Sequence, residues 1–383
     1  MYFSLFFIVI IGYLVVERVR HERRLKRIRI RIHVNGTRGK SSVTRLIAAS
    51  LRRSGIRTLA KTTGSEPQLI LPDGTRETVR RRGPANILEQ LGVIRRADKL
   101  GVNAIVVECM ALDPVLQFVS ETKLILSTIG VITNVRPDHF EVMGDTLDNV
   151  AEALSKSIPQ NGTLVTADVH YFPLFTSLAS AIHSHAILAD AGATCIPEAL
   201  QDHLVFRENV AIAQQVCSLV GLDPAVVNSC LADECSAMEK CVVSNRFIGG
   251  KTIHFINAFA ANDIDSTRII QEWASTRMHC PKPWVALFNN RDDRPLRMRS
   301  FAGFLGNASS YDYVAIIGEG LGLVSRYFRR SLHGETLLPL GGTAPELLIT
   351  ELLKHVPDPE LTIIGMGNEK GAGQLVSRFL RGA

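Results

Sequence analysis

The stretch Val34-Asn35-Gly36-Thr37-Arg38-Gly39-Lys40-Ser41-Ser42 decides the fold of this chain. An alternating, strand-like pattern at 28–34 leads into it, and apolar residues at helical spacing come after it at 43–51. In such a junction the glycines let backbone N–H groups converge on an anion, and the helix N-terminus adds partial positive charge. We therefore predict that residues 35–42 bind the phosphates of a nucleotide.

Two side chains of this loop have predicted roles in phosphate chemistry. Lys40 is expected to reach the β- and γ-phosphates, and Ser41 is expected to ligate Mg²⁺. The loop is shorter than the commonest phosphate-binding pattern, because Val34 stands where that pattern has a glycine. The alternative is a glycine-rich turn with a solvated lysine, which leaves the position of Lys40 and Ser41 at the helix start unexplained.

The composition is that of a globular enzyme with two or three domains. The 383 residues are 46% hydrophobic and 21% charged, with a net charge of +6. Most of the excess lies at 17–31, where eight Arg or Lys accompany two Glu, so the rest of the chain is nearly neutral. This distribution argues against a broad nucleic-acid surface. The seven cysteines fit no usual zinc pattern and predict reduced thiols without a disulfide framework.

The N-terminus predicts a membrane anchor. Residues 2–16 are uncharged and almost wholly apolar, and a basic cluster begins directly after them. The run is shorter than the roughly 20 residues that span a bilayer, but the long side chains of Arg18 and Arg20 extend its effective length. Basic residues after the run place the bulk of the chain in the cytoplasm. The alternative is a helix that is buried in a complex with a partner.

Strands and helices alternate beyond the phosphate loop, which predicts a parallel sheet. We expect strands at 56–61, 104–107 and 124–135 and a helix at 87–100. Ser41, Glu108 and His139 each come after a strand, and ligands bind at the carboxyl ends of strands in such sheets. A hydroxyl, a carboxylate and an imidazole there suit a divalent metal. Taken alone, Glu108 would equally suit a helix cap or an arginine partner, and His139 a surface turn.

Several motifs succeed one another along the chain. They begin with G-T-R-G-K-S-S (36–42), V-V-E-C-M-A (106–111) and T-N-V-R-P-D-H-F-E-V-M-G (133–144). These three resemble the Mur ligase superfamily, which includes folylpolyglutamate synthase. Further motifs are K-T-T-G (61–64), G-P-A-N (83–86), I-P-Q-N-G (158–162), N-A-F-A-A-N-D (257–263), N-N-R-D-D-R (289–294) and G-M-G-N (365–368). With them, essentially the whole chain resembles the membrane-associated ligase subunit of bacterial poly-γ-glutamate (capsule) synthases.

The resemblance implies an ATP-dependent amide ligase. In this family ATP phosphorylates a substrate carboxylate, an amine attacks the acyl phosphate, and ADP and phosphate leave. For the narrower group the carboxylate is the γ-carboxyl of glutamate, and the amine belongs to glutamate or to the growing polymer. The implied cofactors are ATP and Mg²⁺, with Mn²⁺ as an alternative. Lys40 and the metal would cancel the charge of the two anions that have to meet.

The resemblance also implies roles for single residues. It gives catalytic roles to Lys40, Glu108 and His139, and metal ligation to Ser41, Glu108 and His139. Near the phosphates and the substrate it places Thr62, Thr63 and Gly64. In the second half of the chain it implies contacts with the nucleotide or an anionic substrate by Asn262, Asp263, Arg291 and Arg294. For the two arginines, a solvated surface is the alternative.

Three positions depart from the Mur ligase pattern. A lysine that is carbamylated in Mur ligases corresponds roughly to Lys156, which we interpret as a surface residue. The arginine expected after the central domain falls near Glu239, which opens the possibility of an altered substrate or lowered activity. The aspartate that binds ribose corresponds to Ala258, so Asn262 or Asp263 is expected to replace it.

The predicted fold class is α/β. We expect a transmembrane anchor helix at 1–20, a Mur-ligase-like central domain with the phosphate loop and a parallel sheet at 21–240, and a smaller Rossmann-like domain at 241–383. The implied partners are glutamate, the growing polymer and integral membrane subunits of a capsule or poly-γ-glutamate synthase complex, with self-association as a further option and no nucleic acid. Two other functions stay open. One is an ATP-binding subunit that gates polymer export, and the other is a soluble folate-type ligase, which would have no use for the apolar N-terminus.

Overall fold

A computed structural model describes residues 2–63, 67–81, 83, 85–194, 196–200, 203–308, 310–342 and 344–382. Gly64, a predicted substrate contact, lies outside these residues. The chain divides into two compact units, Met1–Gln201 with Val205–Glu234, and Asp202–Leu204 with Cys235–Ala383. The division falls within helix α9 (Ala225–Val242), the helix that also contains the predicted boundary at 240/241.

The N-terminal unit is built on a largely parallel sheet, which has eight strands over the described residues in the order β4-β3-β2-β5-β1-β6-β7-β8. Only the β2–β3 and β3–β4 pairs of this sheet are antiparallel within the described part of the chain. The strands are β1 (Ile30–Asn35), β2 (Thr58–Lys61), β3 (Gln68–Ile70), β4 (Arg76–Thr78), β5 (Ala104–Glu108), β6 (Ile129–Ile132), β7 (Thr163–Thr166) and β8 (His185–Leu188). The helices are α1 (Tyr2–Arg27), α2 (Lys40–Arg53), α3 (Glu89–Lys99), α4 (Pro114–Val119), the π-helix η1 (Ser120–Ile125), α5 (Phe140–Met143), α6 (Leu147–Ser155), α7 (Phe172–Ala181), the 3-10 helix η2 (Glu198–Leu200) and α8 (Arg207–Leu219).

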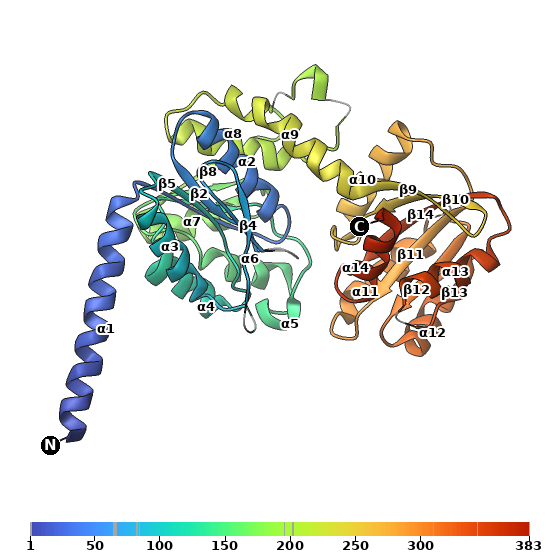
Figure 1. Ribbon diagram of the computed structural model, residues 1–383, viewed down its shortest axis with the longest axis horizontal. Helices are drawn as coiled ribbons and strands as arrows, with labels where there is room; N and C mark the ends of the chain where they lie inside the picture. The colour runs from blue at the N-terminus through green and yellow to red at the C-terminus, as the bar shows by residue number, and fades with distance from the viewer. Residues whose placement is uncertain are drawn as a thin grey trace. The chain divides into compact units, whose positions relative to one another are not determined.

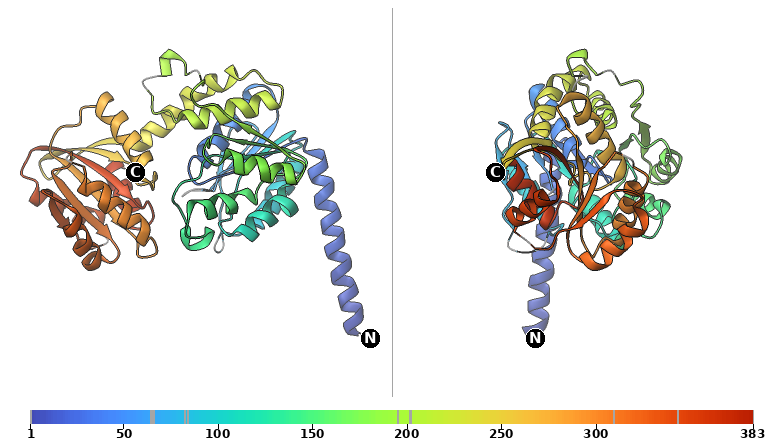
Figure 2. Two further views of the ribbon diagram at one scale, coloured as in Figure 1. Left: turned by 180° about the vertical axis from the view of Figure 1, so that it is seen from behind. Right: turned by 90° about the vertical axis from the view of Figure 1, so that its right-hand side faces the viewer.

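Helices cover both faces of this sheet (Figures 1 and 2). Helix α2 packs on one face of the sheet. Its apolar residues Val43, Ile47 and Leu51 are fully buried, at the helical spacing that the sequence predicts. Helices α3, α6 and α7 pack their apolar residues on the other face. The sheet is therefore buried on both sides, as parallel sheets are, and its strand ends are left for ligands.

The strand predicted at 124–135 begins later than expected, because its first two residues are helical, so that part of the prediction was wrong. Leu124 and Ile125 belong to η1 and are buried, and Leu126 then takes a left-handed backbone conformation with φ 46°. Strand β6 begins only at Ile129. A short apolar run fits a buried strand and a buried helical turn equally well, which is why the pattern misplaced the start of the strand.

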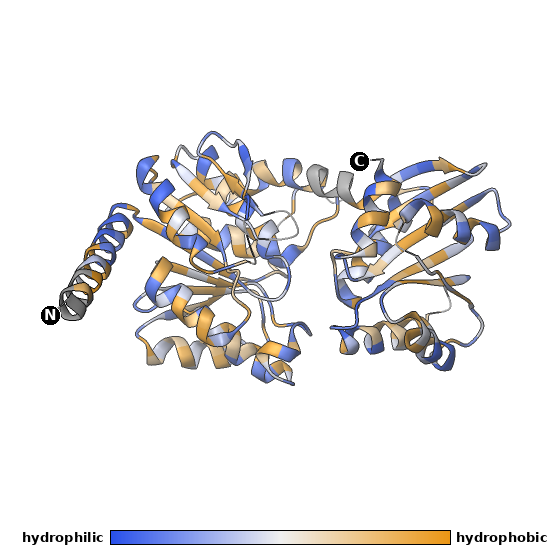
Figure 3. Cartoon of the chain, turned by 60° about the horizontal axis from the view of Figure 1, so that its bottom comes forward, coloured by the Kyte–Doolittle hydropathy of each residue, from blue (hydrophilic) through white to orange (hydrophobic). Residues whose placement is uncertain are grey.

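Helix α1 is longer than the predicted anchor and continues without a break into the N-terminal unit. His21 Nε2 lies 2.8 Å from the carbonyl oxygen of Leu124, and Leu25 is buried. Beyond the part drawn in grey, Figure 3 shows α1 more hydrophobic in its middle turns and hydrophilic where it joins the N-terminal unit. Over the residues that the structure describes, no helix has both the length and the hydropathy needed to cross a bilayer. The predicted transmembrane segment is therefore not supported.

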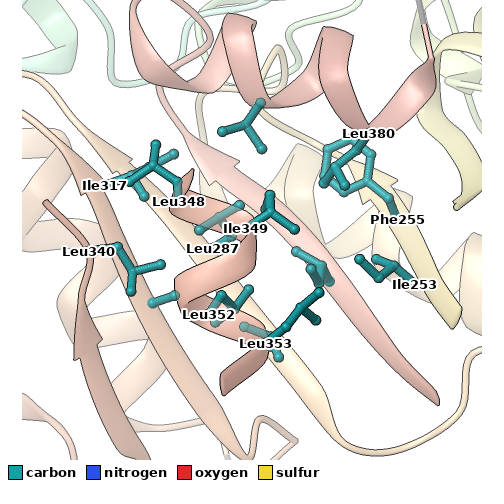
Figure 4. Close-up of a cluster of buried hydrophobic side chains, with 14 of the residues drawn as sticks. Ile253, Phe255, Leu287, Ile317, Leu340, Leu348, Ile349, Leu352, Leu353 and Leu380 are labelled. Atoms are coloured by element: carbon teal, nitrogen blue, oxygen red, sulfur yellow. The ribbon is translucent and has the colours of Figure 1, made fainter. Parts of the chain in front are cut away.

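The C-terminal unit has a second, smaller sheet with six strands over the described residues, in the order β13-β12-β11-β14-β10-β9, parallel except for the β9–β10 pair. The strands are β9 (Val243–Ile248), β10 (Lys251–Asn257), β11 (Trp284–Asn290), β12 (Tyr313–Gly318), β13 (Thr336–Pro339) and β14 (Glu360–Gly367). The helices are α10 (Ile264–Arg277), α11 (Pro295–Gly306), α12 (Leu321–Ser331), α13 (Pro345–His355) and α14 (Ala372–Arg381). Figure 4 shows one face of this sheet, where Leu348 and Leu352 of α13 pack against Leu287 and Ile317 of the strands.

A buried ion pair ties the phosphate-loop strand to η1. His33 of β1 and Glu121 of η1 are almost fully buried, with 2.8 Å between Nδ1 and Oε2. The other carboxylate oxygen of Glu121 accepts hydrogen bonds from the backbone N–H and the hydroxyl of Ser127. Burial opposes protonation of His33, but the nearby Cys109 and Glu121 outweigh it and raise the pKa of His33 to about 10. The imidazole is therefore held as a cation beside the carboxylate.

We expect Glu121→Gln to lower the free energy of unfolding by about 3–5 kcal/mol, because it leaves a buried imidazolium without its counter-charge. The folded-state pKa of His33 is above its unfolded value of 6.5, so this stabilisation is full below pH 6.5 and is lost as the pH rises through about 10. Urea unfolding of the full chain at several pH values measures both effects. Glu351→Gln, which removes an exposed ion pair with Lys354, is the control and should cost about 0–1 kcal/mol. Equal losses in the two variants would contradict the assignment.

Candidate active site

The phosphate loop between β1 and α2 has two glycines that no other residue could replace without strain. Gly36 has φ +122°, and a Cβ there would overlap the side chain and backbone N of Thr133. Gly39 has φ +80°, and a Cβ there would overlap the side-chain amide of Asn209. The backbone of the loop is thus packed against the residues after β6 and against the start of α8. Asn209 carried no predicted role, although its position in the first turn of α8 points towards the loop.

Asn134 fixes the conformation of the loop. Its carbonyl oxygen accepts from the N–H of Thr37 at 3.1 Å, and its side-chain oxygen accepts from the Thr37 hydroxyl at 2.7 Å. The same side-chain oxygen also accepts from the N–H of Arg38 at 3.0 Å. The T-N-V-R-P-D-H motif therefore acts partly through Asn134, which holds the loop in shape before any ligand binds.

Lys40 and Ser41 stand at the start of α2, as the sequence predicts for a phosphate site. Lys40 Nζ donates to the carbonyl oxygen of Gly36 at 2.7 Å and lies 3.4 Å from that of Thr37. The ammonium group is thus folded over the loop, where the phosphates would lie. Ser42 is the next residue in the same turn of α2.

Glu108 connects three segments of the site. It ends β5, is 3% exposed, and its Oε2 accepts from the hydroxyl of Ser41 at 2.8 Å and from the N–H of Thr63 at 2.7 Å. The structure therefore brings together Ser41 and Glu108, two of the three residues that the sequence suggests for a metal site. Thr62, which is buried, and Thr63 lie directly after β2, so the K-T-T-G motif is part of the same strand edge.

His139 reaches the phosphate loop at a different point. Its Nε2 lies 3.7 Å from Oδ2 of Asp138, and that oxygen accepts from Arg38 of the loop at 2.6 Å. Its Nδ1 lies 3.3 Å from Glu141. The backbone of His139 is left-handed, with φ 48°, a conformation that is uncommon outside glycine and is found preferentially at functional sites. Whereas Ser41 and Glu108 are joined directly, His139 is connected through Asp138 and Arg38.

Asn35 was predicted among the phosphate-binding residues, but its side chain has a structural role. Its amide nitrogen donates to Gln117 Oε1 at 2.7 Å and to Ser157 Oγ at 3.0 Å, and all three side chains are buried. Asn35 thus links the end of β1 to α4 and to the segment after α6, and any contact with a nucleotide would come from its backbone.

A buried lysine beside Glu108 has no predicted role. Lys61 is 0% exposed, and its Nζ donates to Glu89 Oε2 at 2.9 Å. Burial lowers the pKa of Lys61, and Glu89 partly offsets this. Burial also opposes ionisation of Glu89, but hydrogen bonds from Arg81 and Lys61 outweigh it and hold the pKa of Glu89 below its usual value. Lys61 is the first residue of the K-T-T-G motif, but the sequence pattern did not predict that its side chain would be buried.

The C-terminal unit places its predicted residues at the carboxyl edge of its own sheet. Asp263 caps α10 by accepting from the N–H of Ser266 at 2.9 Å, and Asn262 precedes it with φ 60°. Arg291 donates to Asp293 at 2.5 Å, and the side chain of Arg294 is 13% exposed. The two arginines therefore lie in the short segment between β11 and α11, and both are close to Asp293.

Three further side chains at this edge were not predicted. Asn289 and Asn368 bind each other's backbone: Asn289 Nδ2 donates to the carbonyl oxygen of Asn368 at 2.5 Å, and Asn368 Nδ2 to that of Asn289 at 3.0 Å. Arg297 donates to the side-chain oxygens of Asn262 at 3.0 Å and Asn368 at 2.5 Å. The motifs at 289–294 and 365–368 contain both asparagines, but nothing in the sequence indicates that they are adjacent.

Comparison with known proteins assigns these features to a family. The Mur ligase middle domain matches residues 34–195, and the poly-gamma-glutamate synthase CapB C-terminal domain matches residues 242–383. PGA synthase CapB of Bacillus subtilis (strain 168) is 32% identical over 372 residues, which cover 96% of this chain and 93% of that protein. The chain belongs to the CapB family. Capsule biosynthesis protein CapB of Bacillus anthracis is 31% identical over 373 residues, with 96% and 79% covered. The resemblance stated from the motifs is thus confirmed.

Solved structures share the α/β fold of this CapB family member at low identity. The bifunctional folylpolyglutamate synthase/dihydrofolate synthase of Yersinia pestis CO92 superposes with a TM-score of 0.69 at 12% identity, covering 95% of this chain and 93% of that one. MurF of Acinetobacter baumannii gives 0.65 at 14% identity, covering 97% and 80%. The Mur-ligase-like fold class is therefore confirmed.

The three departures from the Mur ligase pattern can now be located. Lys156 is exposed, in agreement with its interpretation as a surface residue. Ala258 is fully buried, and its N–H donates to the carbonyl oxygen of Gly365. Its neighbours Asn262 and Asp263 stand at the start of α10. Glu239 lies in α9, and its side chain is outside the described part of the chain.

We expect Gly39→Ala to weaken ATP binding by about tenfold or more. A left-handed backbone costs alanine about 1–2 kcal/mol, and the new methyl group would displace Asn209 from the loop; 1.4 kcal/mol is about tenfold in affinity. Isothermal titration with a non-hydrolysable ATP analogue measures the change. The matched control is Gly92→Ala in α3, where the added Cβ has no neighbour within 4 Å. That variant should gain about 0.5–1 kcal/mol of stability and bind as wild type does. Unchanged affinity in Gly39→Ala would argue against a phosphate site.

Proposed function

We propose that this chain is an ATP-dependent amide ligase that activates the γ-carboxylate of glutamate as an acyl phosphate and joins it to an amine, making poly-γ-glutamate. The observation that carries this proposal is the contact of Glu108 with Ser41 at the phosphate loop. The names of two CapB relatives, a PGA synthase and a capsule biosynthesis protein, support the substrate class. ADP and phosphate are the expected by-products.

The residues of the N-terminal unit fit a nucleotide with a divalent cation. The loop backbone at Gly36 and Gly39 leaves no room for a Cβ, which is typical of loops that approach phosphates closely. Ser41 and Glu108 supply the hydroxyl and carboxylate oxygens that Mg²⁺ and Mn²⁺ prefer, and His139 supplies an imidazole. A folylpolyglutamate synthase of this fold, from Yersinia pestis, was solved with AMPPNP and Mn. When bound, the cation would neutralise phosphate charge and polarise the transferring group.

Lys40, Thr62 and Thr63 would then act on the anions themselves. A carboxylate approaching a triphosphate meets strong repulsion, and Lys40 is placed to offset it because its ammonium lies over the loop. For this, Nζ must exchange the carbonyl oxygens of Gly36 and Thr37 for phosphate oxygens. Thr62 and Thr63 come after β2 beside Glu108, where a substrate carboxylate would be held next to the phosphates. In the C-terminal unit, Asn262, Asp263, Arg291 and Arg294 are the proposed contacts for the nucleotide or an anionic substrate.

We expect Lys40→Ala to lower glutamate-dependent ADP release by about 10²–10³-fold, since one charge that stabilises the transition state is lost. The assay uses the full chain in membranes with its neighbouring subunits, compares glutamate with other amino acids, and identifies γ-linked product. Lys156→Ala, which removes an exposed lysine, is the control and should retain wild-type turnover. Polymer synthesis that persists in Lys40→Ala would refute the site. An ATP turnover rate that does not change with any added amino acid would instead favour a subunit that gates export.

We further propose that α1 attaches the chain to the cytoplasmic face of a membrane, beside integral membrane subunits of a synthase complex. The support is the apolar surface of this helix. Tyr13, Leu14 and Val15 are each more than half exposed in succession, which is unusual for large apolar side chains on a soluble surface. The exposed basic residues Arg20 and Arg23 come next, which suits the anionic surface of the cytoplasmic leaflet.

Removing residues 1–20 should release the chain from membranes, while the contact of His21 with Leu124 stays intact. Flotation of the full chain with lipid vesicles measures the attachment. Replacing Tyr13, Leu14 and Val15 by glutamine should release it as well, whereas Arg20→Gln with Arg23→Gln should only make attachment to anionic vesicles weaker. A truncated chain that still floats would contradict this role of α1.

A further inference from the structure

Two imidazoles and a carboxylate meet on the C-terminal sheet near the start of β14, whereas the candidate-site residues of this unit lie at its carboxyl edge. Glu360 begins β14, and Thr252 of the neighbouring strand β10 is its register partner. His254 lies two residues beyond Thr252 and therefore points to the same face of the sheet as Glu360. His279 belongs to the segment directly after α10. The three residues come from three separate stretches of the C-terminal unit.

The donor atoms of this cluster converge. His254 Nε2 lies 2.6 Å from Glu360 Oε1, and His279 Nε2 lies 3.6 Å from Glu360 Oε2. One ligand atom from each residue lies within 4.8 Å of the others. The imidazole rings are 5.4 Å apart and nearly perpendicular, at 85°, so both nitrogens approach the carboxylate without stacking. Ligand atoms around a tetrahedral Zn²⁺ are roughly 3.3 Å apart, because each lies about 2.0–2.2 Å from the ion.

The backbone around His279 is held in place, although its side chain is exposed. The N–H of Met278 donates to the carbonyl oxygen of Ala274 at 2.9 Å. On the other side, Thr362 Oγ1 donates to the carbonyl oxygen of Pro281 at 2.8 Å. Since Thr362 comes two residues after Glu360 in β14, the segment that carries His279 is fastened to the strand that carries the carboxylate. Ligand positions that are fixed in this way lower the entropy cost of binding.

Burial within the cluster is graded from inside to outside. The side chain of His254 is 10% exposed, that of Glu360 39%, and that of His279 71%. Hydrogen bonding to His254 holds the pKa of Glu360 below its usual value, so the carboxylate is ionised at neutral pH. An ion could therefore enter from the solvent side, meet an anionic oxygen, and keep one coordination position open to water.

We propose that His254, His279 and Glu360 form a binding site for a divalent transition-metal ion, with Zn²⁺ the best match for two imidazoles and one carboxylate. The ion would take the place of the hydrogen bond between His254 and Glu360 and recruit His279. It would link β10, β14 and the segment after α10, and so stabilise the C-terminal unit. None of these residues belongs to the proposed ligase site, so the inference stands apart from the proposed function.

The test is a zinc titration of the full chain by calorimetry, with saturating Mg²⁺ and ATP analogue to occupy the phosphate-loop site. Wild type should show one saturable zinc component. His279→Ala and Glu360→Gln should weaken it by at least about tenfold, because even the loss of an outer-shell partner costs about 10–100-fold. His355→Ala is the matched control and should keep the component, because His355 pairs with Glu351 on an exposed helix face.

Thermal unfolding gives an independent readout. Since an ion that binds only the folded state stabilises it, zinc should raise the unfolding midpoint of wild type and His355→Ala but not of His279→Ala. His279 is exposed, so its removal leaves the fold intact, and circular dichroism without zinc should match wild type. Identical zinc isotherms for wild type and His279→Ala, or no saturable component in wild type, would overturn the proposal.

Discussion

The nucleotide site depends on one buried carboxylate. Glu108 holds the start of α2 through Ser41 and the segment after β2 through Thr63, with a single oxygen that accepts from both. A buried carboxylate is costly unless its oxygens are hydrogen-bonded. Here those bonds come from the segments that have to be aligned for phosphate binding. The cost of burying Glu108 is thus offset by contacts that also set the geometry of the site.

Charge balance around Glu108 explains the buried lysine beside it. Lys61 and Arg81 carry two positive charges, and Glu89 and Glu108 carry two negative ones, so the strand edge is close to neutral before a ligand arrives. A buried pair is stable only when each charge keeps its partners. Arg81 contacts both oxygens of Glu89, at 2.7 and 3.3 Å. The carboxylate of Glu89 is therefore held in place as the hydrogen-bond acceptor for Lys61. Binding of anionic phosphates would then depend on Lys40 and a cation rather than on Lys61.

Local sequence patterns predicted the elements of the phosphate site, whereas the contacts between distant segments could not be predicted. The glycine loop and the strand-terminal Glu108 could be predicted, because each is encoded within one strand–loop–helix unit. The side-chain contact of Asn35 could not be predicted, since its partner Gln117 lies 82 residues away and no local pattern indicates it. Arg297 and its two asparagine acceptors were missed for the same reason. The start of β6 was misplaced because the last two residues of η1, Leu124 and Ile125, are apolar and resemble the beginning of a strand.

The carboxyl edge of the C-terminal sheet shows how such long-range pairs prepare a binding surface. Asn289 and Asn368 donate their amide groups to each other's backbone, which fixes the ends of β11 and β14 side by side. Arg297 is then held between two side-chain oxygens of fixed position. An arginine that moves freely in solution loses rotamer entropy when it binds an anion. Asn262 and Asn368 already order Arg297, so most of that rotamer entropy is lost on folding. The binding free energy of an anion at this edge would therefore not be reduced by ordering this side chain.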